Sequence, residues 1–407
     1  MNPEVNKGFK LPASHLLAQV TAMVLVLGGL GFDQPCQAQK LPPSLFLPEL
    51  LLPRADIDVS ADAQALPTNS PKAPISEFRY DHQGVTKSLS QYQKEANVRA
   101  MLVLKDGQIV YEYNRFPYSQ STLHQSWSIS KQVLSALIGM AIADGAIRSV
   151  TDRMDAYAPE LAVNGFAGVT FKQALQMSSG VLYNEEQDRF KLFMDTIKDN
   201  LTFGGAGHAL KDKALDLALT QAYAPGSSYS YASINSQALS RALEKAVGMP
   251  YQRYLEVKLW KPLGTTDKAK ILVDRRKEAF TFCCLYATTR SYAMFGLLFA
   301  QHGRLHDKQL VPAEWVLKST TFSKDANNWH AVPRAGRAMG LYGFGYHWWP
   351  LEGGRGDFSA LGVFGQAIHV LPKQNTVVVR ISGDFEEPGA HAEENAIMGR
   401  ALADYLD

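Results

Sequence analysis

The sequence is poor in cysteine and has almost no excess of charge of either sign. Three cysteines in 407 residues cannot build a disulfide-rich scaffold. The 41 Lys and Arg residues and the 39 Asp and Glu residues give a formal net charge of +2. Such a balance provides no broad positive field to hold phosphates, so we expect no nucleic-acid partner. The hydrophobic content of 46% excludes a disordered chain and is typical of a globular protein.

Two common catalytic signatures are also absent. The chain contains no Gly-x-Ser-x-Gly, which disfavours a hydrolase built around a nucleophile elbow. It contains no His-Glu-x-x-His, and its ten histidines show no spacing typical of zinc ligands. We therefore expect neither a metal nor another cofactor. His347 lies beside two tryptophans and is a candidate to line a cleft, although such a residue is more often a satisfied, partly buried histidine.

Residues 1–38 have the pattern of a secretory signal peptide. Lys7 and Lys10 precede an uncharged apolar stretch, and the small residue Ala38 follows it. The alternative is a membrane anchor that stays attached, but the apolar run of residues 16–32 is short for a span. We expect cleavage after Ala38, export to the periplasm or the medium, and no membrane span in the mature chain.

Residues 39–75 carry seven prolines, a density that no regular helix tolerates. We interpret this segment as an extended tether or a wrapping arm, followed by a compact domain over residues 76–407. After cleavage only Cys283 and Cys284 remain. Adjacent Cα atoms lie about 3.8 Å apart, below the usual disulfide range, so we expect two free, buried thiols.

Strand-like segments lie at both ends of the compact domain. Residues 101–113 and residues 367–382 each indicate a pair of strands joined by a turn, and a helical run follows at 391–405. Most segments between them have helical spacing. This order predicts an α+β fold, with a central antiparallel sheet assembled from distant segments and flanked by terminal helices. A helical subdomain is expected to be inserted at about residues 131–330.

A serine and a lysine lie three residues apart at the start of a strongly apolar helical stretch. This offset places Ser128 and Lys131 on one face of the helix. A serine hydroxyl needs a base before it can act as a nucleophile, and burial lowers the pKa of a lysine towards values at which it can serve. Free N–H groups at the helix start also favour a developing negative charge. The Ser-x-x-Lys spacing alone is expected by chance about once or twice in 400 residues.

Two further segments are candidates to complete a site. Tyr231 follows a Pro-Gly turn and precedes a helix, where a phenol can act as base and then as acid. Near the C-terminus, Gly362 and Gly365 lead into a strand and would let a substrate approach the strand edge. A backbone N–H of that edge could join the N–H of Ser128 in an oxyanion hole. Packing is the more frequent role of a lone tyrosine, whereas a bend in a packed strand explains the glycines about equally well.

In this order and spacing, the segments resemble the serine β-lactamase and penicillin-binding superfamily, above all its class C-like branch of esterases and 6-aminohexanoate-dimer hydrolases. The resemblance runs from about residue 99 to residue 400. It rests on seven motifs: Asp106-Gly107, Ser128-x-x-Lys131, Met177-Ser-Ser-Gly180, Pro225-Gly226, Tyr231-x-Ser233, Lys261-Pro-Leu-Gly264 and Gly362-x-x-Gly-Gln366.

The resemblance implies a β-lactamase/transpeptidase-like fold and a role for each motif. Ser128 would be the acylated nucleophile, Lys131 its base, and Tyr231 the group that assists proton transfer to the leaving group. Aligning the C-terminal strand with the family implies an oxyanion hole formed by the backbone of Ser128 and Ala360. The remaining residues would contact the substrate, and these are Ser233, Gly362, Gly365 and Gln366.

Two departures from the β-lactamases bear on the substrate. Ser233 stands where they usually carry Asn, and the same alignment places Asp357 where they carry a lysine. That lysine is a cation positioned for the carboxylate of a penicillin, whereas Asp357 would repel an anion. We therefore expect hydrolysis of a small ester or linear amide, with no prediction of oligomeric state. The alternatives are β-lactamase or D-Ala-D-Ala carboxypeptidase activity and, in another class, a non-catalytic cell-wall binder or sensor.

Overall fold

The computed structural model describes residues 52–201, 219–321, 341–383 and 391–407. The chain divides into two units, residues 1–42 and residues 43–407, and the fold below is that of the second unit. The predicted signal peptide, 1–38, lies outside the described residues. Within these ranges, no helix combines the length and the apolar composition that crossing a membrane requires.

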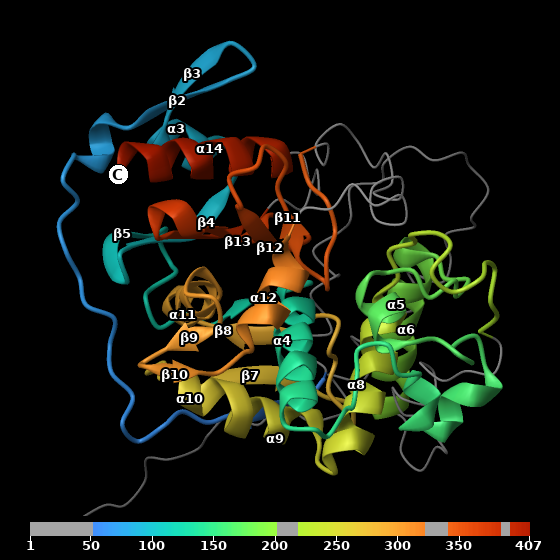
Figure 1. Cartoon of the computed structure of the whole chain (residues 1–407). Helices are drawn as coiled ribbons and strands as arrows, with labels where there is room; N and C mark the ends of the chain where they lie inside the picture. Colours follow the sequence, from blue (N-terminus) through green and yellow to red (C-terminus); the bar gives the residue numbers. More distant parts are fainter. Residues whose placement is uncertain (1–51, 202–218, 322–340, 384–390) are drawn as a thin grey trace, which may run out of the picture. The chain divides into compact units, whose positions relative to one another are not determined.

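A six-stranded antiparallel sheet forms the centre of this unit (Figure 1). The strand order is β11-β12-β13-β14-β4-β5, so strands from the two ends of the domain lie side by side, which confirms the predicted α+β class. The strand bounds are β4 Val98–Lys105, β5 Gln108–Asn114, β11 Trp349–Pro350, β12 Phe358–Gly362, β13 Gln366–Leu371 and β14 Thr376–Ser382.

Alternating apolar side chains give the sheet two buried faces. Leu102 and Leu104 of β4 belong to the core beneath helix α11 (Thr289–Ala300). Met101 and Val103 belong to the opposite core, beneath α3 (Leu89–Glu95) and α14 (Ala392–Tyr405). Figure 1 shows α11 and α14 on opposite sides of the sheet. The predicted terminal helix at 391–405 is thereby confirmed as one of its covering layers.

The helical region is shorter than the predicted span of 131–330. Helices α4, α5, α6, α8 and α9 belong to it, whereas α11 packs on the central sheet. Gly296 lets α11 approach closely, because a Cβ at this position would lie 2.6 Å from Val377 Cγ1. Helical spacing in the sequence does not tell whether a helix packs on other helices or on the central sheet. The bounds are α4 Ile129–Ala143, α5 Phe171–Leu175, α6 Glu185–Leu201, α8 Ser233–Val247, α9 Tyr251–Leu255, α10 Lys261–Leu263 and α12 Ala313–Thr320.

A second, four-stranded sheet has the order β1-β7-β8-β6 and borders α4. Its strands are β1 Arg54–Ile57, β6 His124–Gln125, β7 Ala269–Leu272 and β8 Leu285–Ala287. Two short hairpins complete the strands, namely β2 Arg79–His82 with β3 Val85–Ser88 and β9 Arg304–Leu305 with β10 Lys308–Gln309.

The described part of the proline-rich segment is an arm that wraps the domain. β1 pairs with β7, and farther along the N–H of Asn69 donates to the carbonyl of Ile109. The predicted domain start near Ser76 is therefore too late. Prolines exclude a helix, but an edge strand and an extended segment accommodate them, so a high proline content does not mark the domain boundary here.

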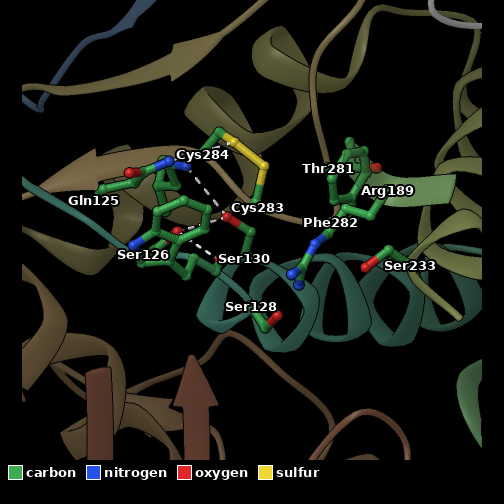
Figure 2. Close-up of a disulfide and its surroundings, with 12 residues drawn as sticks. Gln125, Ser126, Ser128, Ser130, Arg189, Ser233, Thr281, Phe282, Cys283 and Cys284 are labelled. Carbon is green, nitrogen blue, oxygen red and sulfur yellow. Dashed lines mark hydrogen bonds between the residues drawn. A yellow bond between two sulfur atoms is a disulfide. The ribbon is translucent and has the colours of Figure 1, made fainter. Parts of the chain in front are cut away.

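Cys283 and Cys284 form a disulfide with each other (Figure 2). Both residues are buried as predicted, but the prediction of free thiols is wrong. That prediction relied on the Cα separation usual for cysteines from different parts of a chain. A vicinal pair instead closes a small ring across its own peptide bond, with Cα atoms 3.7 Å apart and with Cys284 at a positive φ of 74°.

Candidate active site

The start of α4 brings the predicted serine and lysine together. Ser128 is the N-cap residue, and Lys131 lies in the first turn. The Ser128 side chain makes no capping hydrogen bond, so its hydroxyl is available to other partners. Lys131 Nζ donates to Ser128 Oγ at 3.0 Å. An amine and a hydroxyl within hydrogen-bond distance have the arrangement that proton transfer between them requires.

Lys131 is held in an apolar, water-poor position. Its side chain is almost fully buried because α4 is covered on nearly every side. Burial lowers the pKa of Lys131 from 10.5 to about 7, with opposing effects from the Glu185 carboxylate and Arg189. The Nζ atom also donates to the carbonyl of Phe282 at 2.8 Å. Near neutral pH the amine is therefore partly uncharged and has two fixed neighbours.

Tyr231 closes one side of this amine. Lys131 Nζ lies 5.0 Å from the centroid of the Tyr231 ring, which stacks on Trp349. Burial raises the pKa of the Tyr231 phenol above its usual range; the Glu185 carboxylate adds to this effect and the Ser128 hydroxyl opposes it. The phenol is therefore protonated at neutral pH and can act as a donor.

The turn before Ser128 has an unusual backbone that β12 approaches closely. Trp127 has a φ of +46°, a region that aromatic residues rarely adopt outside sites that need a special geometry. Gly362 lies against this turn, because a Cβ on it would be 2.5 Å from the Ser126 carbonyl oxygen. The sequence predicted that Gly362 gives a substrate access to the strand edge, whereas in the structure it lies against the turn that carries Ser128.

We expect Gly362→Ala to displace that turn. The added methyl would meet the Ser126 carbonyl oxygen, a backbone atom that cannot rotate away, so we predict a loss of about 1–3 kcal/mol of stability. We also expect acylation to slow by about 100-fold, because small displacements of reacting groups are costly. Thermal unfolding and the rate of labelling by a fluorophosphonate test this. Gly399→Ala is the control, since its Cβ would come no closer than 3.6 Å to His369; equal labelling rates for both variants would contradict the prediction.

Ser233 faces a carboxylate instead of open solvent. The residue is fully buried, and its N–H and hydroxyl donate to the two oxygens of Glu185 at 2.7 and 2.6 Å. Glu185 also pairs with Arg189, one turn along α6, at 3.2 Å. The predicted substrate contact of Ser233 is therefore not supported, and its bonds join the start of α8 to α6. Sequence reasoning missed Glu185, because the spacing of Glu185 and Arg189 indicates only a local ion pair.

The register of β12 argues against Ala360 as an oxyanion donor. The N–H of Leu351 donates to the carbonyl of Asp357, so backbone groups at Asp357 and every second residue after it point towards β11. Ala360 has the opposite orientation and faces Ile368 of β13. Beyond the end of β11, the same alternation directs the N–H of Leu361 to the open edge, and Val363 follows β12 in the hairpin turn. A shift of one residue in the pairing of a strand reverses the direction in which each of its N–H groups points.

Residues 86–403, more than half of the chain, match the family model described as Beta-lactamase. The chain belongs to the Beta-lactamase family. It is 26% identical over 309 residues to the 6-aminohexanoate-dimer hydrolase of Paenarthrobacter ureafaciens, covering 72% of this chain and 74% of the relative. The predicted family and the assignment as a hydrolase are thereby confirmed.

Solved structures show the same fold. A Bacillus anthracis protein provisionally described as a 6-aminohexanoate-dimer hydrolase superposes with a TM-score of 0.76 at 20% identity, covering 92% of this chain and 98% of that one. A penicillin-binding protein homologue from Pyrococcus abyssi gives a TM-score of 0.59 at 18% identity, covering 78% and 76%. These likenesses confirm the predicted β-lactamase/transpeptidase-like fold.

Asp357 does not have the effect on substrate that the alignment suggested. Its side chain is almost fully buried, 2.8 Å from Arg400 Nε and 3.1 Å from Arg355 Nε. Two guanidinium groups therefore neutralise it. The end of β12 that lies against the Ser128 turn carries Leu361 and Gly362. β12 still carries no lysine at the place where the β-lactamases have one. The argument against a penicillin substrate therefore remains.

Gly365 and Gln366 serve the hairpin between β12 and β13. Gln366 is buried, and its amide donates to the carbonyls of Phe364 and Ser382 at 3.0 and 3.1 Å. Gly365 has a φ of +81°, which this tight turn requires. The predicted substrate contacts of these two residues are not supported, because the Gln366 amide is hydrogen-bonded within the hairpin and Gly365 forms its turn.

His347 is a buried histidine with one of its two ring nitrogens hydrogen-bonded, while its Nε2 has no hydrogen-bond partner among the described residues. It is fully buried, its Nδ1 lies 3.0 Å from the carbonyl oxygen of Lys131, and burial lowers the pKa of the ring to about 3. It stays neutral at physiological pH and supports the first turn of α4 instead of lining a cleft. Burial favours the structural interpretation over a role in lining a cleft, although the ring is fully buried and not fully hydrogen-bonded.

Proposed function

We propose that this chain is an exported serine hydrolase that cleaves an ester or a linear amide through an acyl-enzyme on Ser128. The observation that carries the proposal is the buried Lys131 amine, 3.0 Å from the Ser128 hydroxyl, with its pKa lowered to about 7. Export rests on the signal-peptide pattern of residues 1–38.

In the proposed acylation, uncharged Lys131 accepts the proton of Ser128 while Oγ attacks the substrate carbonyl. The Phe282 carbonyl takes one N–H of the amine. Once the amine is uncharged, the 3.0 Å hydrogen bond between Nζ and Ser128 Oγ can reverse, so that the Nζ lone pair accepts the hydroxyl proton. The negative charge that develops on the substrate oxygen is stabilised by two backbone N–H groups, those of Ser128 and Val363. Val363 replaces Ala360 in this role because it follows Gly362, which contacts the Ser128 turn.

Collapse of the tetrahedral intermediate needs a proton for the leaving group. The protonated phenol of Tyr231 supplies it and is reprotonated by the ammonium of Lys131, whose Nζ lies over its ring. Lys131 returns to the uncharged form, so no net proton is gained or lost. Water then attacks the ester on Ser128 by the same path in reverse, which releases the acid and restores the hydroxyl.

The substrate class follows from the walls of the site. Tyr231 contacts Trp349 and Phe344, which form an aromatic side, and β12 presents no lysine to a carboxylate. The relative from Paenarthrobacter ureafaciens is named for hydrolysis of a 6-aminohexanoate dimer. An apolar acyl group on an ester or linear amide fits this surface better than an anionic bicyclic lactam.

We expect kcat/KM for p-nitrophenyl butyrate to exceed that for the β-lactam nitrocefin by at least about 10-fold, equivalent to about 1.4 kcal/mol of transition-state binding. A panel of 4-nitrophenyl esters, linear amides and β-lactams measured on the purified protein tests this. Faster turnover of nitrocefin would overturn the argument from the strand edge. A folded protein that no fluorophosphonate labels would instead support the non-catalytic binder.

A further inference from the structure

The Cys283–Cys284 disulfide lies next in the chain to the residue that holds the lysine amine. Phe282 accepts the hydrogen bond from Lys131 Nζ at 2.8 Å, and Cys283 follows it directly. Figure 2 shows the disulfide above the start of α4, where Ser128 and Ser130 lie. The ring closed by the two cysteines therefore begins one peptide bond from the carbonyl that orients the amine.

The other end of the ring is joined to the same turn. The N–H of Leu285 donates to Ser130 Oγ at 3.2 Å, and the Leu285 carbonyl accepts from the N–H of Ser126 at 2.7 Å. The hydroxyls of Ser126 and Ser130 lie 2.7 Å apart. Phe282, before the disulfide, thus contacts Lys131. Leu285, after the disulfide, contacts Ser126 and Ser130, which lie on either side of Ser128 in the chain.

Phe282 lies between two fixed points of the chain, namely the disulfide ring and Thr281, whose hydroxyl donates to the Ser236 carbonyl at 3.1 Å. β8 begins only at Leu285, where it pairs with β7 and β6, whereas Phe282 lies outside any strand. A disulfide between adjacent cysteines restricts rotation about the bonds of the peptide that links them. It therefore transmits the fixed position of Leu285 to Phe282. Both cysteines are buried, and Gln125 Nε2 donates to Cys284 Sγ at 3.6 Å, which holds the ring in place.

We propose that the Cys283–Cys284 disulfide is a positioning element that holds the Phe282 carbonyl at Lys131, so that the amine lone pair faces Ser128 Oγ. This inference rests on the proposed function. Without the ring, Phe282 is fixed only on the Thr281 side, so its carbonyl can turn away and the amine loses one of its two fixed neighbours. Because misplacement of a reacting group slows its reaction, we expect acylation to fall by about 10-fold to 100-fold.

The test compares wild type with Cys283→Ala/Cys284→Ala by the rate of fluorophosphonate labelling and by kcat and KM for p-nitrophenyl butyrate. The expected result is slower labelling and lower kcat with unchanged KM, because the ring supports the base and does not line the substrate site. Ile271→Val is the control. Ile271 is buried and pairs with Leu285 across β7 and β8, so its variant perturbs the same sheet without touching Phe282. We expect it to label at the wild-type rate.

Two further measurements keep the outcomes separate. Alkylation of the unfolded wild type without reductant, followed by peptide mapping, should leave Cys283 and Cys284 unlabelled, and labelling of both would overturn the proposal. If the double variant does not fold, the wild type can be reduced by a phosphine, which with one water molecule converts the disulfide to two thiols and becomes its oxide. Labelling should then slow and recover on reoxidation with a small-molecule disulfide. Unchanged labelling in either form overturns the inference alone, whereas an unlabelled wild type overturns the proposed function as well.

Discussion

Ser128→Ala is expected to abolish fluorophosphonate labelling and to lower kcat by about 10⁶-fold, the scale of nucleophile loss in other serine hydrolases. The substitution removes the only atom that the mechanism uses to attack the substrate, but it leaves the backbone N–H groups and α4 in place. Since the Ser128 side chain makes no capping hydrogen bond, we expect little change in thermal stability. Residual hydrolysis should reflect binding and the oxyanion hole alone.

The control for this experiment is another serine of the same helix. Ser135 is fully buried in α4, and its hydroxyl has no hydrogen-bond partner among the described residues. Ser135→Ala should therefore keep both labelling and turnover. Mass mapping of the labelled wild type identifies the modified residue directly. Covalent labelling of Ser128→Ala at the wild-type rate would place the nucleophile elsewhere and contradict the assignment.

Acylation of the wild type is expected to rise with pH through about 7 and to level off above it. The base must be uncharged to accept a proton, and burial lowers the pKa of Lys131 to about 7. Below that value the amine is an ammonium and cannot act, so the rate should increase about 10-fold from pH 6 to pH 8. Stopped-flow acylation by p-nitrophenyl butyrate across this range measures the profile.

Lys131→Met should remove this pH step and slow acylation by about 10³-fold, within the range ascribed to general bases. Methionine fills much of the same buried space without a lone pair or a charge. Lys318→Met is the control, because Lys318 lies exposed on α12 in a pair with Glu314. A Lys131→Met profile that still rises through pH 7, or near-normal acylation, would remove the lysine from its assigned role.

The same pKa also predicts a dependence of stability on pH. Between about pH 7 and 10.5 the unfolded chain keeps a proton on Lys131 that the folded chain has lost. The unfolded state then binds more protons, so the free energy of unfolding should rise with pH across this window. Denaturant unfolding of wild type and Lys131→Met compares the two slopes. The variant should lack this contribution, and identical slopes would contradict the lowered pKa.

Several features of the site were predictable from the sequence because they lie within single elements. The offset of three residues on one helix brought Ser128 and Lys131 together, and the apolar faces of α4 indicated that the lysine is buried. Short apolar runs joined by turns likewise predicted β4, β5, β13 and β14 and the sheet they share. In each case the periodicity of one backbone element determines which side chains are neighbours.

Contacts between elements were not predictable in the same way. The bonds of Ser233 to Glu185, the direction of the Ala360 N–H and the partners of Asp357 depend on how α6, α8 and β12 pack. A single strand's sequence does not specify its register against a neighbour, and a slip of one residue exchanges the N–H groups that face the site.

The amino-acid sequence by itself determined the family, the antiparallel sheet and the serine and lysine of one helical turn, because local spacing and alternation encode them. Only the tertiary structure decided which backbone N–H groups face the open strand edge and that Glu185 accepts the hydrogen bonds of Ser233. It also decided that the vicinal cysteines follow Phe282, whose carbonyl accepts the hydrogen bond of Lys131. These relations join segments that lie far apart along the chain. Their geometry is set by packing and by strand register, which no short sequence pattern contains.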